Sequence, residues 1–155
     1  MVKLMKNYSG FTLVELMVVV SIMGILAGIA VPSFQSLSQS QQVKNASFEL
    51  FSSLSLARSE AIKRNSNVTV TPVNASDWGQ GWAITSAGGE SLKIQSSLKG
   101  VSVTGASVIY TRSGRPGSVA AFQIDVAAAS VPTSNRRCIK IELSGMPHTN
   151  RGACS

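Results

Sequence analysis

The hydrophobic positions divide the chain into one long apolar run, a stretch with helical periodicity, and a series of short alternating segments. The apolar run extends from Phe11 to Val31, which as a helix is long enough to cross a bilayer core of about 30 Å. Glu15 is the only charged residue in this run. A carboxylate at that depth is costly unless a partner neutralises it, so Glu15 is a candidate functional residue.

Residues after Pro32 have the pattern of an amphipathic helix. Small and aliphatic residues recur there at spacings of three and four, which places them on one helix face. These residues are Val43, Ala46, Leu50, Leu54, Ala57 and Ala61. Asn and Ser accumulate around 63–67, where we expect the helix to end.

The rest of the chain has the short alternating runs and glycine-containing turns of a β-sheet. A loop is expected at 127–135, because Pro132 would stop a strand. The predicted fold class is α+β: a long N-terminal helix, with a transmembrane half and an amphipathic half, packed on an antiparallel β-sheet head domain. Strands are expected at 68–71, 81–85, 92–95, 101–104, 108–111, 119–126 and 138–143.

A conventional cleaved secretory signal is the alternative for the N-terminus, because Lys3 and Lys6 precede an apolar run. Three features oppose it: the run is too long for a typical signal core, Glu15 lies inside it, and no clear small-residue cleavage site follows it. The two lysines predict that the N-terminus lies in the cytoplasm and that the chain beyond the run lies outside.

Composition narrows the classes of function. The formal net charge of +7 permits contact with nucleic acid, anionic lipid or acidic proteins, without choosing among them. The chain has one His, no glycine-rich phosphate loop before a helix and no metal-ligand cluster in its sequence, which argues against an enzyme. We therefore expect no catalytic residue, no metal and no cofactor.

Two cysteines, Cys138 and Cys154, lie near the C-terminal end. Outside the cytoplasm the default is a disulfide, and closing this loop is worth on the order of 3 kcal/mol in the chain-entropy model. Two reduced thiols, or a metal pair assisted by His148, are the rival interpretations. No Cys-x-x-Cys spacing supports a metal pair.

The N-terminal residues resemble a known signal. A short basic leader ending at Gly10, followed by Phe-Thr-Leu-Val-Glu-Leu and the apolar run, resembles the class III signal of type IV pilins and type II secretion pseudopilins. The resemblance implies that a prepilin peptidase cleaves between Gly10 and Phe11, that Phe11 is N-methylated, and that Glu15 pairs with the amino terminus of a neighbouring subunit. The implied partners are other pilins or pseudopilins in a filament, membrane lipid before assembly, and an inner-membrane assembly platform.

A second resemblance covers most of the chain. The block ARSEAIKRN at 57–65, the sequence Trp78-Gly-Gln-Gly-Trp82, and a cysteine-containing strand before a final Cys154 resemble the GspH/FimT branch of minor pilins and pseudopilins. This implies the pilin fold and a structural subunit of a type IV pilus that acts in pilus assembly or initiation. The alternative is a GspH-type pseudopilin of type II secretion.

The two resemblances together imply a domain division and a location. The protein is expected in the inner membrane, single-pass, with a cytoplasmic N-terminus and a periplasmic head, and then in a filament or at its tip. The expected parts are a leader at 1–10, a transmembrane helix at 11–31, an amphipathic continuation at 32–66 and a β-rich globular head at 67–155.

DNA binding in natural transformation is a third hypothesis. Some members of this branch bind DNA through a Gly-Arg-x-Arg motif, but the matching place here, Gly145-Met-Pro-His148, lacks the arginines. Other cations remain that would attract phosphates without reading sequence, and scattered surface charge is their simplest interpretation. They are Arg112, Arg115, Arg136, Arg137, Lys140 and Arg151.

Other conspicuous residues have structural interpretations. We expect the cations of the block 58–64, with Glu60, to form a charged helix end. Trp78 and Trp82 are expected to anchor a turn and the core between helix and sheet. His148 is expected to lie in a surface loop.

Overall fold

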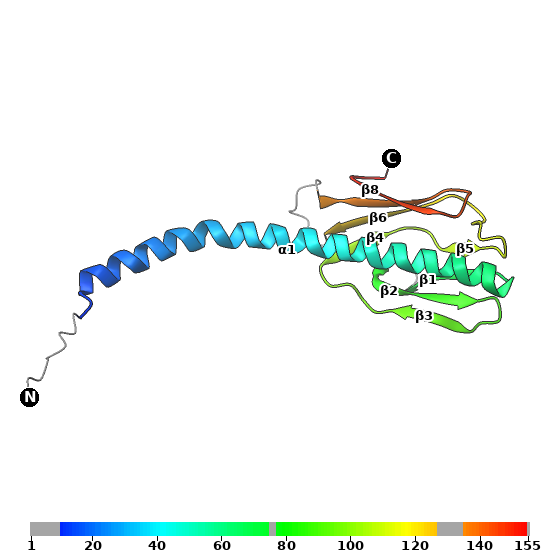
Figure 1. The fold of residues 1–155 in the computed structure, drawn as a ribbon, viewed down its shortest axis with the longest axis horizontal. Coiled ribbons are helices and arrows are strands. Elements are labelled where there is room, and N and C mark those ends of the chain that lie inside the picture. Colours follow the sequence, from blue (N-terminus) through cyan, green and yellow to red (C-terminus); the bar gives the residue numbers. More distant parts are fainter. Residues whose placement is uncertain (1–9, 75–76, 127–134, 155) are drawn as a thin grey trace, which may run out of the picture. The chain divides into compact units, whose positions relative to one another are not determined.

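The computed structural model describes residues 10–74, 77–126 and 135–154. The chain forms two compact units, Met1–Leu37 and Ser38–Ser155, and the helix α1 (Leu13–Arg64) contributes residues to each. The strands follow α1 in the sequence (Figure 1). They are β1 (Val68–Asn74), β2 (Asp77–Ser86), β3 (Ser91–Gln95), β4 (Val101–Thr104), β5 (Val108–Tyr110), β6 (Ala120–Val126), β7 (Arg137–Ile141) and β8 (Pro147–Arg151).

The second part of α1 buries the predicted stripe. All six residues of that stripe, from Val43 to Ala61, are buried, so the expected amphipathic face is confirmed. The helix ends at Arg64, within the expected range. It ends there because Asn65 adopts a left-handed conformation with φ of 50°. The N–H of Ser66 then donates to Ala61 O and that of Asn65 to Ile62 O, each at 3.2 Å, which is a Schellman cap.

The strands form two four-stranded antiparallel sheets rather than the single sheet that the sequence indicated. One sheet has the order β3-β2-β1-β5 and the other the order β4-β6-β7-β8. The chain therefore passes from one sheet to the other between β3 and β4, between β4 and β5, and between β5 and β6. The predicted α+β class, a long helix with an antiparallel head, is confirmed.

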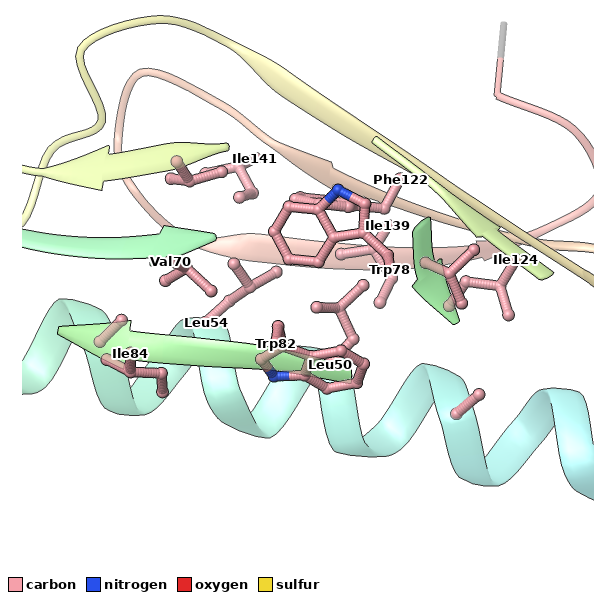
Figure 2. Close-up of a cluster of buried hydrophobic side chains, with 14 of the residues drawn as sticks. Leu50, Leu54, Val70, Trp78, Trp82, Ile84, Phe122, Ile124, Ile139 and Ile141 are labelled. Carbon is pink, nitrogen blue, oxygen red and sulfur yellow. The ribbon is translucent and has the colours of Figure 1, made fainter. Parts of the chain in front are cut away.

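The core lies where α1 meets both sheets (Figure 2). Leu50 and Leu54 come from the helix, and Trp78 and Trp82 come from β2. Trp78 packs edge-to-face on Phe122 of β6, with ring centroids 4.8 Å apart, which fixes the two sheets against each other. The prediction that both tryptophans anchor the core is confirmed.

The structure corrects the sequence predictions near the C-terminus. His148 was expected in a loop, but it lies in β8 and pairs with Lys140 of β7. β7 ends at Ile141, so Leu143, which was expected to continue the strand, is 62 % exposed in the following turn. The expected loop falls mostly on residues 127–134, which lie outside the described residues.

Candidate functional site

The predicted processing point lies just before α1. Gly10 and Phe11 precede the first helical residue, Leu13, and both are exposed. A Cβ built at Gly10 meets no atom within 4 Å. Any requirement for glycine at this position is therefore not imposed by packing within the described residues.

Glu15 lies in the first turn of α1, with its side chain exposed. The N–H of Glu15 donates to Thr12 Oγ1 at 3.2 Å, which makes Thr12 the N-cap. Thr-x-x-Glu is the spacing of a capping box, and an acidic side chain in the first turn also complements the helix dipole. Glu15 therefore has a local role that the sequence prediction missed, although the spacing to Thr12 was visible there.

Among the residues that the structure describes, none covers the apolar run around Glu15. Its exposed large side chains range from 51 % exposed for Ile22 to 73 % for Phe11 and Leu13. The helix is long and apolar enough to cross a membrane by length and composition. A continuous apolar surface of this kind is stable only against lipid or against other helices.

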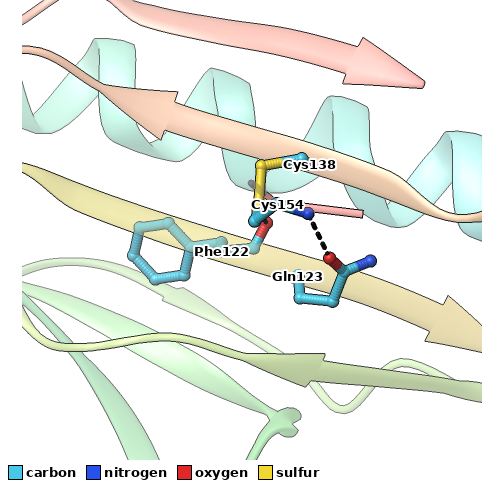
Figure 3. Close-up of a disulfide and its surroundings, with 4 residues drawn as sticks. All are labelled: Phe122, Gln123, Cys138 and Cys154. Atoms are coloured by element: carbon cyan, nitrogen blue, oxygen red, sulfur yellow. Dashed lines mark hydrogen bonds between the residues drawn. A yellow bond between two sulfur atoms is a disulfide. The ribbon is translucent and has the colours of Figure 1, made fainter. Parts of the chain in front are cut away.

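The two cysteines form a disulfide, as predicted (Figure 3). Cys138 lies in β7, and Cys154 follows β8, with the two Cα atoms 5.1 Å apart. The N–H of Cys154 also donates to Gln123 Oε1 of β6 at 2.7 Å. The segment after β8 is therefore fastened to two neighbouring strands of one sheet.

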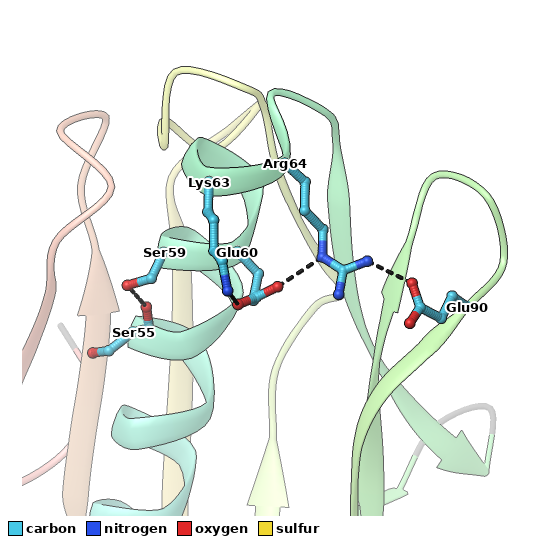
Figure 4. A network of polar contacts seen from close by, with 6 residues as sticks. All are labelled: Ser55, Ser59, Glu60, Lys63, Arg64 and Glu90. Atoms are coloured by element: carbon cyan, nitrogen blue, oxygen red, sulfur yellow. Dashed lines mark hydrogen bonds and ion pairs between the residues drawn. The ribbon is translucent and has the colours of Figure 1, made fainter.

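The end of α1 is charged, as expected, and its charges are paired (Figure 4). Glu60 accepts from Arg64 Nε at 2.7 Å and lies 3.6 Å from Lys63 Nζ. Arg64 also bonds to Glu90, which precedes β3. The hydrogen bond from Arg64 is the main cause that lowers the pKa of Glu60, and the bonds to Glu60 and Glu90 raise the pKa of Arg64.

Arg58 does not belong to this network. Its Nε donates to Gly114 O at 3.0 Å and its Nη2 to Ser144 O at 3.3 Å, and its Nη1 lies 2.9 Å from Met146 Sδ. One side chain thus holds two turns of the head against α1. The sequence prediction missed this role, because it depends on turns more than 50 residues away in the chain.

The structure brings three of the six predicted DNA-contacting cations together. Arg136, Arg137 and Arg151 line one polar cavity of about 160 Å³, together with Lys44 of α1, which the sequence prediction did not include. Arg137 and Arg151 face each other across β7 and β8. Arg136 is paired with Asp125 at 2.7 Å.

The other predicted cations lie elsewhere. Arg112 and Arg115 belong to a turn closed by a bond of 2.9 Å from Thr111 N–H to Arg115 O, and Gly114 of this turn contacts Arg58. Arg58 and Lys44 lie about 21 Å apart along α1, at a rise of 1.5 Å per residue. Lys140 lies opposite His148 in the pairing of β7 with β8 and is not among the described residues that line the polar cavity. The six cations therefore do not form one patch.

A larger opening adjoins the polar cavity. It is a groove of about 640 Å³, and we call it the α1–β8 groove. The groove is lined by Lys44, Ser47, Phe48, Phe51, Arg137, Pro147, His148 and Thr149.

Within the residues that the structure describes, no group of three or more His, Cys, Asp or Glu is placed to hold a metal ion.

Comparison with known proteins gives two family matches. The family model for the type II transport protein GspH matches residues 46–145, and that for the prokaryotic N-terminal methylation motif matches residues 5–31. A fimbrial protein of Pseudomonas aeruginosa is 50 % identical over 58 residues, which are 37 % of this chain and 37 % of that protein. The type IV major alpha-pilin of Moraxella bovis is 48 % identical over 46 residues, 30 % of this chain and 29 % of its own. The matched part is thus about a third of the length of these curated relatives.

Solved structures share the fold over a longer part of the chain. The type IV minor pilin FimU of Pseudomonas aeruginosa superposes with a TM-score of 0.62 at 20 % identity, covering 74 % of this chain and 92 % of that one. The minor pseudopilin EpsH of the type II secretion system of Vibrio cholerae gives 0.53 at 12 % identity, covering 74 % and 97 %. At these identities the likeness is one of fold, and it confirms the predicted pilin fold.

Proposed function

The chain belongs to the family of the type II transport protein GspH, and from this premise we propose that it is a minor pilin, a structural subunit that helps to assemble or initiate a type IV pilus. The observation that carries the proposal is the uncovered apolar surface of α1 around a single carboxylate, Glu15. Lipid covers this surface before assembly, and neighbouring pilin helices cover it afterwards. The role is structural, and no catalytic step is assigned to the chain.

The proposed location is the inner membrane, with the N-terminus in the cytoplasm and the head in the periplasm. The two lysines before the apolar run support this orientation. The Cys138–Cys154 disulfide supports an oxidising compartment for the head. From there the subunit is extracted into the filament by an inner-membrane assembly platform.

Maturation is proposed to occur by cleavage between Gly10 and Phe11, followed by methylation of the new amine on Phe11. Gly10→Val should block cleavage, which would be seen as a slower-migrating band and an unprocessed mass. Gly24→Val is the matched control, because a Cβ at either glycine meets no atom within 4 Å, and Gly24 lies inside α1. Cleavage of the Gly10→Val protein at the same bond would refute this assignment.

Glu15 is proposed to neutralise the amino terminus of an adjacent Phe11 when subunits pack. An ammonium and a carboxylate are each costly in a low-dielectric helix bundle and tolerable as a pair. Glu15→Gln tests the charge, because the variant keeps the backbone N–H that donates to Thr12 Oγ1, and Gln is as suitable as Glu three residues after a Thr N-cap. We expect this variant to be inserted and cleaved but poorly incorporated into sheared filaments. Glu142→Gln, an exposed carboxylate in the head, is the control; equal incorporation of both variants would contradict the role.

A GspH-type pseudopilin of type II secretion is the second candidate, and the family match favours it. Pilins and pseudopilins both pack an apolar N-terminal helix into a filament, so the structure of the helix does not distinguish the two functions. The phenotype of a deletion strain does. Loss of surface pili with normal release of secreted enzymes would support the pilus. The reverse result would support the secretion system.

DNA uptake is a third candidate, supported only by the gathering of Arg137 and Arg151 with Lys44 around one cavity. Contacts to phosphates are strongest at low salt. We therefore expect the protein to retard a DNA duplex at low ionic strength if this function holds, and the Arg137→Ala variant to do so less. Absence of retardation at low salt would remove the hypothesis.

A further inference from the structure

The α1–β8 groove exposes apolar surface between α1 and β8. Phe48 projects from α1 on this side and is 69 % exposed, whereas Pro147 on β8 is buried. Phe51 is half-buried and packs against the core cluster. The groove therefore separates α1 from β8 on this side of the head. Phe48 and Phe51 form its aromatic floor, and Phe51 reaches the core.

β8 borders this groove as the last strand of its sheet. In the described part of the chain no strand pairs with β8 on the side away from β7. Gly152 N–H donates to Arg136 O at 2.9 Å. Because backbone groups alternate in direction along an antiparallel strand, Thr149 and Arg151, at odd spacing from Gly152, direct their N–H and C=O away from β7. These groups are free to pair with one more strand.

The charges around the groove have one sign. Lys44 and Arg137 line both the groove and the adjoining polar cavity, and Arg151 lines the cavity. The described residues that line the two openings include no Asp or Glu, although Asp125 neutralises the nearby Arg136. A second copy of this chain is disfavoured as the occupant, because the side chains keep a net positive charge even without Lys3 and Lys6 of the leader and would repel. The complementary occupant is acidic.

We propose that the α1–β8 groove accepts an extended acidic segment of a neighbouring, non-identical subunit, which adds as a fifth strand beside β8. The segment pairs its backbone with Thr149 and Arg151. Its side chains on the face toward α1 place an apolar group over Phe48 and carboxylates beside Lys44, Arg137 and Arg151, because these cations and Phe48 lie on the same side of the sheet. A nucleic acid would use the cations but neither the aromatic floor nor the strand edge. The inference rests on the proposed function for the identity of the partner, since only a filament subunit brings such a segment beside the head.

The test uses the full-length chain, isotopically labelled in detergent micelles. The probe is a blocked Val–Glu peptide in which Val and Glu take turns at every second position with Ser between them, so that both side chains face α1. We expect the peptide to shift the amide signals of Thr149 and Arg151 and to slow their hydrogen exchange about tenfold. Lys44→Glu should weaken peptide binding about tenfold, since an attraction is replaced by a repulsion. Arg115→Glu makes the same charge change in the turn that contains Arg112, away from the groove, and should alter binding less than about twofold.

Three results would overturn the proposal. One is an equal response to a matched peptide in which Lys replaces each Glu. Another is an equal loss of binding in Lys44→Glu and Arg115→Glu. The third is protection of Thr149 and Arg151 by anionic phospholipid vesicles or by a DNA duplex but not by the Val–Glu peptide.

The peptide experiment needs neither cleavage nor a filament, so its result is independent of the Gly10 and Glu15 tests. If those variants behave as expected and the peptide does not bind, the groove proposal fails and the pilin function stands. If the peptide binds but the Glu15→Gln protein assembles normally, the filament role of Glu15 fails and the groove remains.

Discussion

Reduction of the Cys138–Cys154 disulfide should lower the free energy of unfolding of the head by an amount that follows from the length of the loop it closes. The bond closes a loop with a sequence separation of 16 residues. Loop-closure entropy for that length corresponds to about 3 kcal/mol at 25 °C. At a urea dependence of about 2 kcal/mol per molar, the unfolding midpoint should fall by about 1.5 M. The midpoint temperature should fall by about 12 °C for a unit of this size.

Tryptophan fluorescence measures the head alone, because the two tryptophans of the chain, Trp78 and Trp82, both lie in its core. Urea titrations of the oxidised and the reduced protein in the same micelles isolate the cross-link from any change of sequence. The double variant Cys138→Ala and Cys154→Ala should lose at least as much, since Cys138 is also buried. Oxidised and reduced midpoints that agree within about 0.3 M would refute the reasoning, because loop closure would then contribute less than about 0.6 kcal/mol.

Two further predictions concern the turns and the pH response of the head. Gly145→Ala should destabilise it by at least about 2 kcal/mol more than Gly89→Ala, as measured by urea titration. Both glycines have φ near +80°, but a Cβ at Gly145 would lie 1.9 Å from Gly114 O, whereas one at Gly89 meets nothing within 4 Å; equal losses would show that the turn yields. Burial raises the pKa of Tyr110 from 10.0 to about 12, against an opposing effect of Arg58, so stability should fall as the pH rises from about 10 through about 12. Tyr110→Phe should remove that alkaline loss, and an unchanged pH profile would mean that another group causes it.

The sequence was sufficient for the helix and for most of the core. The spacing from Val43 to Ala61 fixed which face of α1 is buried, and Asn65 could be expected to end the helix because asparagine tolerates a left-handed backbone. The N-cap Thr12 could also have been found, because Glu15 follows it at the spacing Thr-x-x-Glu. These features depend on residues close together in the chain, which is why one sequence reveals them.

Features that depend on distant residues could not be predicted. β8 has the sequence Pro-His-Thr-Asn-Arg, in which only Pro147 is buried, so no apolar alternation marks it. The strand exists because β7 offers a backbone to pair with. Lys44 was overlooked for a similar reason: its neighbours at the polar cavity, Arg137 and Arg151, come from the far end of the chain. The α1–β8 groove is formed by β8 and by the part of α1 that contains Lys44, so it could not be predicted either.

The repeated passage of the chain between the two sheets has a consequence for how the head fails. β4 belongs to one sheet and β5, the next strand, to the other, so neither layer consists of a continuous piece of sequence. Each strand pairs only within its own sheet, but the connections alternate between the sheets, so a pull along the chain through β4 and β5 loads both layers together. Under mechanical load the head should therefore give way in a single step, without a half-folded survivor that retains one intact layer.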